Sequence, residues 1–186
     1  MKKYQIIYAD PPWKFKNYND KKATNWVGGH YGLMTTQDIC KLPIKNITDD
    51  NCILFIWGTF PKLPDCLGVI KGWGFTYKTL GFNWYKRNRK KEGLFFGMGY
   101  WTRSNSEYCL LATKGHPKRI DTSVFQVVEH PRLEHSQKPK IIRDKIVELV
   151  GDLPRIELFA REKTEGWDVW GNEVESDIDL GGHNGK

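Results

Sequence analysis

The residues best suited to chemistry lie near the start of the chain, in the stretch IIYADPPWKF at positions 6–15. An apolar run ends there in Asp10, which is followed by Pro11, Pro12 and Trp13. The prolines carry no N–H and an ionised carboxylate only accepts hydrogen bonds, so the segment offers acceptors with almost no competing donor. A group with two hydrogens to donate, such as the exocyclic amine of a nucleobase, would fit this cluster.

Such an amine is a poor nucleophile because its lone pair is delocalised into the ring. Acceptors that hold both hydrogens out of the ring plane would localise the lone pair, aim it at an electrophile and stabilise the positive charge that develops on nitrogen. Trp13 would then stack on a base that has left its helix. The alternative, which the residues alone leave open, is a strand end followed by a Pro-Pro turn and a core tryptophan.

The elements that must position these residues alternate between buried strands and helices. Apolar runs predict strands at 4–10, 51–58, 75–86, 107–115, 123–130, 155–160 and 167–173, and helices at 35–42, 60–74 and 138–151. This order predicts an α/β fold in one domain over residues 1–173, with a largely parallel sheet. Ligands bind outside the carboxyl ends of such strands, and Asp10, Arg161 and Asn172 lie at or just past strand ends, so we expect them on one rim. We expect residues 174–186 to form a disordered polar tail.

Composition bounds the class of protein. The chain has 186 residues, a net charge of +7 and many aromatic residues, which favours a folded protein with a polyanionic partner such as nucleic acid. Its four cysteines form no Cys-x-x-Cys pair, which argues against a disulfide framework and a zinc site, and we expect no bound metal. The sequence shows no signal core and no apolar run of membrane-spanning length, so we expect a cytoplasmic protein without membrane partners.

A basic and aromatic segment at 86–105 is the clearest candidate for binding nucleic acid. It contains Lys86, Arg87, Arg89, Lys90 and Lys91, followed by Phe95, Phe96, Tyr100 and Trp101. Positive charge beside aromatic rings suits attraction to phosphates and stacking on bases, and we expect the five cations with Tyr100 and Trp101 to make these contacts. A solvated run of charge is the alternative.

The chain also resembles a known family. ADPPW is the signature of amino-group methyltransferases that use S-adenosylmethionine, and further motifs are similar to the branch that contains the catalytic subunit of the eukaryotic messenger-RNA adenine methyltransferase and its bacterial and phage relatives. The similar segments, in family order, are YGLM at 31–34, GYWTRSNSEYCLLATKG at 99–115, QKP at 137–139, IELFAR at 156–161 and WGNE at 170–173. With the signature they span residues 4–173, and the resemblance implies a Rossmann-like methyltransferase fold.

The resemblance implies a role for individual residues. Asp10 and the Pro11 carbonyl would accept from the target amine, Trp13 would stack on the base, and Pro12 belongs to the same catalytic motif. Glu107 matches a family glutamate, for which a site role and a salt bridge are both open. The implied cofactor-binding residues are Asp10 beside the methionine part, Lys138 at its carboxylate, Arg161, Asn172 and Glu173 around the ribose, and Phe159 as a pocket lining or an ordinary core residue.

Two features depart from the family pattern. Glu162 and Lys163 stand where the family has a His-Asn pair, so some cofactor contact must differ, with Lys163 or Thr164 as candidates. The family's Asp-Ile pair ahead of the signature, which contacts the adenine ring of the cofactor, has no counterpart before Asp10. Residues 120–137 are the candidate region for that contact.

These features predict an enzyme that transfers a methyl group from S-adenosylmethionine to the N6 amine of adenine in DNA. RNA is the alternative substrate, and a non-catalytic nucleic-acid-binding subunit is the alternative of another class. An enzyme that methylates the amine of cytosine or of a glutamine side chain would more often replace the Asp or the Trp of the signature. Sequence specificity would come from loops 14–30 and 86–105 or from a second subunit, or it would be relaxed. A homodimer and a heterodimer both stay open.

Overall fold

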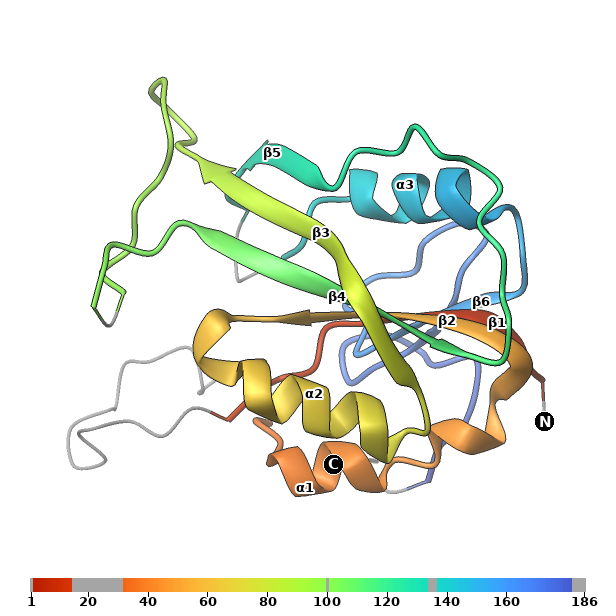
Figure 1. Cartoon of the computed structure of the whole chain (residues 1–186). Coiled ribbons are helices and arrows are strands. Elements are labelled where there is room, and N and C mark those ends of the chain that lie inside the picture. The colour runs from red at the N-terminus through yellow and green to blue at the C-terminus, as the bar shows by residue number, and fades with distance from the viewer. Residues whose placement is uncertain (1, 15–31, 100, 134–136, 182–186) are drawn as a thin grey trace.

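The computed structural model describes residues 2–14, 32–99, 101–133 and 137–181, which form one sheet with helices against both of its faces (Figure 1). The strands are β1 (Tyr4–Ala9), β2 (Thr48–Gly58), β3 (Thr76–Arg87), β4 (Ser106–Lys114), β5 (Val127–Pro131), β6 (Arg155–Leu158) and β7 (Asp168–Trp170). The helices are α1 (Thr36–Lys41), α2 (Leu63–Gly72) and α3 (Ile141–Val150), with short 3-10 turns η2 (Ile44–Asn46) and η3 (Phe60–Lys62). None of these helices has the length and apolar character that crossing a membrane requires.

The sheet has the strand order β5-β3-β4-β2-β1-β6-β7, which places β1 among its inner strands. β1 pairs in parallel with β2 and β6, β6 pairs in parallel with β7, and β3 with β5. Of the described strands, β4 alone runs the other way, since it pairs antiparallel with β2 and β3. The predicted α/β fold with a mostly parallel sheet is confirmed, and the predicted strands and helices are found with their ends shifted.

Side chains of β1 alternate between two apolar layers, as expected for a strand buried on both faces. Ile7 and Ala9 face a layer formed with α1 and α2, while Ile6 and Tyr8 face a layer formed with α3. The first charged residue after this buried run is Asp10, directly past the end of the strand.

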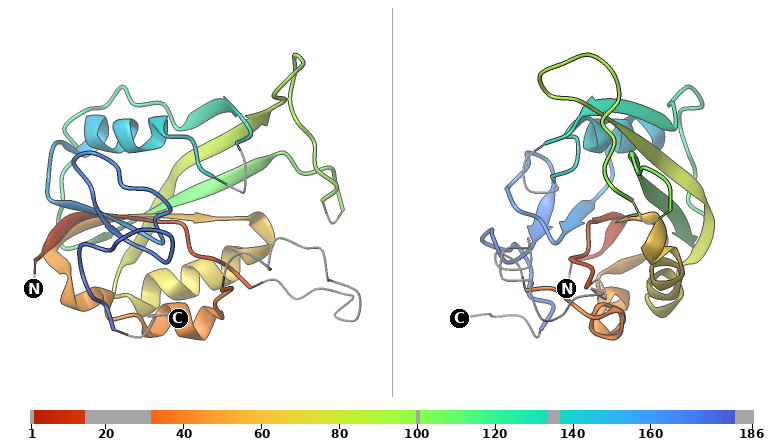
Figure 2. Two further views of the ribbon diagram at one scale, coloured as in Figure 1. Left: turned by 180° about the vertical axis from the view of Figure 1, so that it is seen from behind. Right: turned by 90° about the vertical axis from the view of Figure 1, so that its left-hand side faces the viewer.

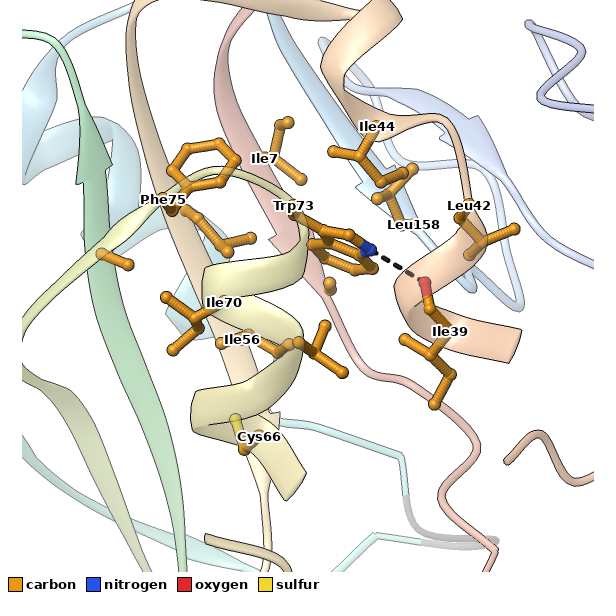
Figure 3. Packing of buried hydrophobic residues seen from close by; sticks show 14 of the residues in the cluster. Ile7, Ile39, Leu42, Ile44, Ile56, Cys66, Ile70, Trp73, Phe75 and Leu158 are labelled. Atoms are coloured by element: carbon orange, nitrogen blue, oxygen red, sulfur yellow. Dashed lines mark hydrogen bonds between the residues drawn. The ribbon is translucent and has the colours of Figure 1, made fainter. Parts of the chain in front are cut away.

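In the apolar layer under α1 and α2, Trp73 connects the two helices (Figure 3). It directly follows the last residue of α2. Its indole Nε1 donates to the backbone carbonyl of Ile39 in α1 at 2.8 Å, and the side chain is fully enclosed. A buried tryptophan needs a partner for its N–H, and here that partner fixes one helix to the other. Trp13 and Met34 belong to the same layer, so it also supports the segment that carries Asp10.

Helix α3 lies on the opposite face and is held there by a buried ion pair. Its apolar stripe, which includes Ile142 and Ile146, packs on the sheet. Arg143 donates from Nε and Nη2 to the two carboxylate oxygens of Glu157 in β6, at 2.6 and 2.8 Å, and both side chains are buried. This bidentate contact fixes the first turn of α3, and with it the preceding Lys138, relative to β6.

The segment after β7 differs from its expected form. Residues 174–181 pack on the domain, although a disordered tail is predicted for 174–186. Leu180 is buried, and the carboxylate of Asp177 accepts from the backbone N–H of Val169 at 2.9 Å. The polar composition conceals two apolar residues, Ile178 and Leu180, that contact the core. The last residues, 182–186, lie outside the described ranges, as does nearly all of the predicted loop 14–30.

The described residues of 88–105, between β3 and β4, form an arm that projects beyond the sheet (Figure 1; Figure 2). At its base, Asn105 Nδ2 donates to the backbone carbonyl of Lys86 at 2.9 Å. Asn88 Nδ2 donates to the carbonyl of Leu94 at 3.0 Å, which closes the first turn of the arm. These bonds connect the arm to the carboxyl end of β3.

Replacing Arg143 by methionine should destabilise the protein by about 3–5 kcal/mol, because Glu157 is then left charged and buried without its partner. Chemical unfolding followed by circular dichroism measures this loss, and adding Glu157→Leu should recover much of it. The control is Arg87→Met, which removes a surface pair with Glu129 and should cost about 1 kcal/mol or less. Equal losses for the two arginine variants would contradict the role given to the buried pair.

Candidate active site

The strand register gathers residues from distant parts of the chain at one edge of the sheet. Ala9, Leu158 and Trp170 are paired side by side at the ends of β1, β6 and β7. The residues that follow these strands therefore emerge together at the carboxyl edge, as the sequence predicts. Because β4 runs antiparallel, Glu107 near its start reaches the same edge, opposite Trp84 of β3.

Asp10 is held by a lysine from the segment before α3. Lys138 Nζ donates to Asp10 Oδ2 at 2.8 Å and lies 5.6 Å from the centre of the Trp57 ring. The Lys138 side chain is 10% exposed and that of Asp10 is 22% exposed, so the pair lies at the border between core and solvent. No described residue donates to Asp10 Oδ1. One carboxylate oxygen is thus fixed by a cation while the other remains an acceptor at the edge of the sheet.

A second carboxylate contacts the same lysine. Glu107 Oε2 lies 3.3 Å from Lys138 Nζ, and Glu107 Oε1 accepts a hydrogen bond from Lys86 Nζ. Lys86 Nζ also lies 5.1 Å from the centre of the Trp84 ring. Asp10, Lys138, Glu107 and Lys86 therefore form an ion array in which acid and base alternate.

The ion array keeps its buried members charged. Burial alone would raise the pKa of Glu107, but Lys138 and Lys86 outweigh burial and hold this pKa below its usual range. Burial alone would lower the pKa of Lys138, but the carboxylates of Asp10 and Glu107 outweigh it and raise this pKa. The charge on each of these two groups thus depends on its neighbours.

The prolines of the signature already have hydrogen-bond donors in the structure. The Pro11 carbonyl accepts from the Trp13 N–H at 2.9 Å, and the Pro12 carbonyl accepts from the Met34 N–H at 2.9 Å. The sequence predicts an acceptor cluster with almost no competing donor, and this expectation is too simple because neighbouring backbone supplies one donor to each carbonyl. Each carbonyl oxygen has a second lone pair beyond this bond.

Trp13 lies in the core, where its ring is not open for the predicted stacking on a base. Its side chain is 6% exposed, and its indole Nε1 donates to the backbone carbonyl of Trp57 at 3.0 Å. The alternative that the sequence left open, a core tryptophan after a Pro-Pro turn, describes this residue. Trp13 anchors the segment that carries Asp10 between the end of β2 and Met34.

The segments that follow β6 and β7 run against each other in close contact. The backbone N–H of Ala160 donates to the carbonyl of Trp170 at 3.0 Å. A Cβ at Gly171 would lie 2.1 Å from the carbonyl oxygen of Ala160, so this approach requires glycine. The two segments therefore present their following side chains on one shared surface.

Four of the predicted cofactor-binding residues lie on these two segments. Arg161 Nε is 3.8 Å from Glu173 Oε1, and Asn172 is exposed. Phe159 has φ 62°, a left-handed conformation that costs a residue other than glycine about 1–2 kcal/mol, and its ring packs edge-on against Trp170 at 5.4 Å. Backbone strain of this kind clusters at functional sites. The set offers donors and acceptors suited to the hydroxyl groups of a ribose.

The two residues that depart from the family pattern have partners of their own. Lys163 Nζ donates to Asp177 at 2.9 Å, which holds the segment after β7 in place. Glu162 pairs with Lys140 at 3.1 Å. These contacts give both positions a local structural role, and a cofactor contact by Lys163 or Thr164 remains a prediction.

The residues predicted to bind nucleic acid do not all lie on an open surface. Lys86 belongs to the ion array, with its ammonium on Glu107, and its assignment to phosphate binding stays a prediction. Arg87 pairs with Glu129 at 2.6 Å, and Arg89 Nε donates to the backbone carbonyl of Arg132 at 2.6 Å. Lys86 and Arg87 have protein partners because β3 continues through both residues, so they are part of the sheet and not of a loop.

The outer part of the arm fits the prediction better. Lys90 and Lys91 are exposed, and Trp101 is fully exposed to solvent. Phe96 also exposes half of its surface. An exposed aromatic side chain near cations is suited to a base and its phosphate. Tyr100 lies outside the described residues.

Sequence reasoning did not assign two residues that lie against the predicted site. Glu107 was left open between a site role and a salt bridge, and the structure places it against both Lys138 and Lys86. Trp57, which packs against the Lys138 ammonium, was assigned only to a buried strand. A signal for Glu107 existed in its family match, whereas the position of Trp57 depends on strand register.

The proteins similar to this chain carry the names of methyltransferases. The MT-A70 family model matches residues 4–173. The chain is 35% identical to the Type II methyltransferase M.MunI of a Mycoplasma species, over 93% of this chain and 78% of that protein. It is 30% identical to the N6-methyladenosine RNA methyltransferase MTA1 of Pyricularia oryzae and 27% identical to the N(6)-adenine-specific methyltransferase METTL4 of Homo sapiens. These two matches cover 92% and 93% of this chain but 47% and 38% of the relatives, so the chain spans less than half of their length.

Replacing Gly171 by alanine should weaken binding of S-adenosylmethionine about tenfold or more, because the added methyl group forces the segments after β6 and β7 apart. Calorimetric titration with S-adenosylmethionine measures the change. The matched control is Gly68→Ala in α2, where a Cβ meets no atom within 4 Å and the helix should gain about 0.5–1 kcal/mol. Unchanged cofactor affinity in the Gly171 variant would separate these segments from the cofactor site.

Proposed function

The chain belongs to the MT-A70 family, and we propose that it transfers a methyl group from S-adenosylmethionine to the exocyclic N6 amine of adenine in DNA. The observation that carries this proposal is the carboxylate of Asp10 at the end of a strand buried on both faces. Its Oδ2 accepts from Lys138 at 2.8 Å, and its Oδ1 has no donor among the described residues. An amine brought to this edge of the sheet therefore finds a fixed acceptor.

The residues at the carboxyl edge suit S-adenosylmethionine, which supplies an electrophilic methyl group when it is bound. A lysine ammonium is the natural partner for the carboxylate of its methionine part, and Lys138 provides one. The segments after β6 and β7 supply polar groups for the ribose and an aromatic ring beside them. The residues proposed to hold the cofactor are Asp10, Lys138, Phe159, Arg161, Asn172 and Glu173.

Asp10 and the Pro11 carbonyl orient the amine of the target base. The Pro11 oxygen keeps a lone pair beyond the bond from the Trp13 N–H, and Asp10 keeps Oδ1. With both hydrogens held, the nitrogen lone pair points along the line of attack on the methyl carbon. With S-adenosylmethionine bound, a new bond from nitrogen to the methyl carbon would replace the bond from that carbon to sulfur, and S-adenosylhomocysteine would leave. The Asp10 carboxylate would stabilise the positive charge that grows on nitrogen until the amine proton passes to solvent.

We prefer DNA to RNA as the substrate because of how much of each relative's length this chain matches. The relative named a Type II methyltransferase is matched over 78% of its length, whereas the relative named an RNA methyltransferase is matched over 47%. The exposed arm suits a nucleic acid of either kind, since Lys90 and Lys91 offer charge for phosphates and Trp101 offers a ring for a base. RNA is therefore the second candidate substrate.

Replacing Asp10 by alanine should lower the methylation rate by at least about 100-fold, because a charge-stabilising group is removed from the reacting amine. The fold should survive, since Glu107 remains beside Lys138. Transfer of labelled methyl groups to DNA, with thermal unfolding as a check on the fold, measures both effects. Asp144→Ala on the exposed face of α3 is the matched control, and a fully active Asp10 variant would refute the proposal.

Removing the two exposed lysines of the arm, by Lys90→Ala with Lys91→Ala, should reduce the salt dependence of DNA binding by roughly 1.8 in logarithmic slope. Fluorescence anisotropy at several salt concentrations measures the slope. Lys71→Ala in α2 with Lys78→Ala near the start of β3 removes the same charge from exposed positions and should leave the slope unchanged. Equal slopes for the two double variants would mean that the arm is an ordinary solvated surface.

The substrate itself is decided by nucleoside analysis. Duplex DNA, single-stranded DNA and RNA are incubated separately with methyl-labelled S-adenosylmethionine and digested to nucleosides. We expect label in N6-methyladenine from DNA. Label in N6-methyladenosine from RNA alone would select the second candidate, and label on cytosine would overturn the assignment of the base.

A further inference from the structure

The strongest feature of the site that the proposed function leaves unexplained is Glu107. Its carboxylate lies between two lysines, with Oε2 at 3.3 Å from Lys138 Nζ and Oε1 bonded to Lys86 Nζ. Its side chain is 13% exposed, so this carboxylate is largely removed from water. Burying a charge is expensive unless partners compensate, and a group with two cationic partners at a site edge calls for a reason.

We infer that Glu107 is a positioning residue for methyl transfer, which holds the Lys138 ammonium in place so that Lys138 in turn fixes the carboxylate of Asp10. This inference rests on the proposed function, since it assigns Glu107 a part in the same reaction. Glu107 touches neither the amine nor the methyl group in this assignment and acts through Lys138.

The geometry explains why Lys138 needs a second carboxylate. A lysine side chain is long and flexible, and a single ion pair with Asp10 would leave its ammonium free to swing around one oxygen. Glu107 holds the ammonium from β4, Asp10 holds it at the end of β1, and the Trp57 ring lies 5.6 Å away on β2. Contacts from three strands define one position for Nζ. Asp10 Oδ2 is thereby fixed, and its Oδ1 has a fixed direction for the amine.

Charge balance gives Lys86 a place in the same arrangement. Lys86 and Lys138 are both cationic, and Glu107 lies between them, so its charge compensates the repulsion of the two lysines. The ion array carries two acids and two bases and is neutral as a whole. Removing the charge of Glu107 leaves an excess positive charge in a largely buried site and takes away one of the carboxylates that hold Lys138.

Other ionisable groups near the array do not replace Glu107. Cys109 lies two residues after Glu107 on β4, in the apolar layer formed with α3. Burial raises the pKa of its thiol well above the usual value, so the thiol stays neutral. Glu157 on β6 is committed to Arg143. The groups that set the charge state of Lys138 are therefore Asp10 and Glu107.

The test uses the full chain with Glu107→Gln, which keeps the shape of the side chain and removes its charge. Two carboxylates raise the pKa of Lys138, so removal of one lowers it, and Lys138 then loses its proton at a lower pH. We expect the alkaline limb of the single-turnover methylation rate to move down by about 1–3 pH units. We also expect the maximal rate to fall by about 100-fold, because the reacting groups are misplaced. Glu107→Asp keeps the charge and should restore the alkaline limb.

A second readout does not depend on activity. Titration of the ¹³C-labelled Lys138 side chain by NMR, assigned with Lys138→Arg, should show its proton lost at a lower pH in Glu107→Gln than in the unchanged protein. Glu148→Gln, an exposed glutamate of α3, is the matched control and should alter neither the rate profile nor the titration. If Glu107→Gln does not fold, Lys86→Met with Glu107→Gln removes both charges and leaves no excess cation.

The outcomes separate this inference from the proposed function. An unchanged pH profile and Lys138 titration in a folded Glu107 variant would overturn the inference while methylation by the unchanged protein upholds the function. A lower yield of folded protein with an unchanged profile would likewise mean a purely structural glutamate. If the unchanged protein methylates no nucleic acid, the proposed function fails, and the inferred role of Glu107 in the reaction fails with it.

Discussion

The contact between Lys138 and Asp10 is the constraint on which the described site depends. A carboxylate at the end of a buried strand has rotational freedom that a reaction on a weak nucleophile cannot tolerate. The ammonium of Lys138 fixes one of its oxygens at 2.8 Å, and the fold supplies the lysine from the segment before α3. The buried pair of Arg143 and Glu157 secures that helix on β6, the strand next to β1. One ion pair therefore fixes α3 on the sheet, and the other fixes Asp10 through the lysine that precedes this helix.

The signature segment combines rigidity with anchoring. The prolines limit the backbone conformations available to residues 11 and 12, and neighbouring N–H groups hold their carbonyls. Trp13 fastens the far end of the segment to the carbonyl of Trp57 at 3.0 Å. The ring is thus part of the support for Asp10. The exposed aromatic side chains of the arm, among them Trp101 and Phe96, are instead the ones suited to meet a base.

Sequence patterns predicted the fold class and the sheet edge at which the site residues gather. Both could be predicted because they depend on local periodicity and strand order. The alternation of strands with helices fixes the position of strand ends, so Asp10, Arg161 and Asn172 could be placed on one rim. The environment of Lys86 could not be predicted in this way. A run of basic residues indicates solvent, but the run begins inside β3, and pairing with β4 brings Lys86 to Glu107.

The burial of Trp13 and the order of the segment after β7 could not be predicted from the sequence either. Whether an aromatic residue beside a strand end is open or enclosed depends on Met34 and Trp57, which lie far away in the sequence. The polar composition after residue 173 predicts disorder, yet Leu180 finds a place in the core. Tertiary contacts decide whether such residues are buried and ordered, and these contacts cannot be read from composition.

The inner position of β1 also has a consequence for folding. This strand comes early in the chain, but it pairs with β6, which comes late, so the contacts that enclose it span most of the sequence. Contacts of such long range form slowly, and on the ribosome they cannot form until β6 has emerged. Until then one edge of an apolar strand remains unpaired, which favours association with other chains. Synthesis of this protein should therefore depend on chaperones more than its modest size suggests.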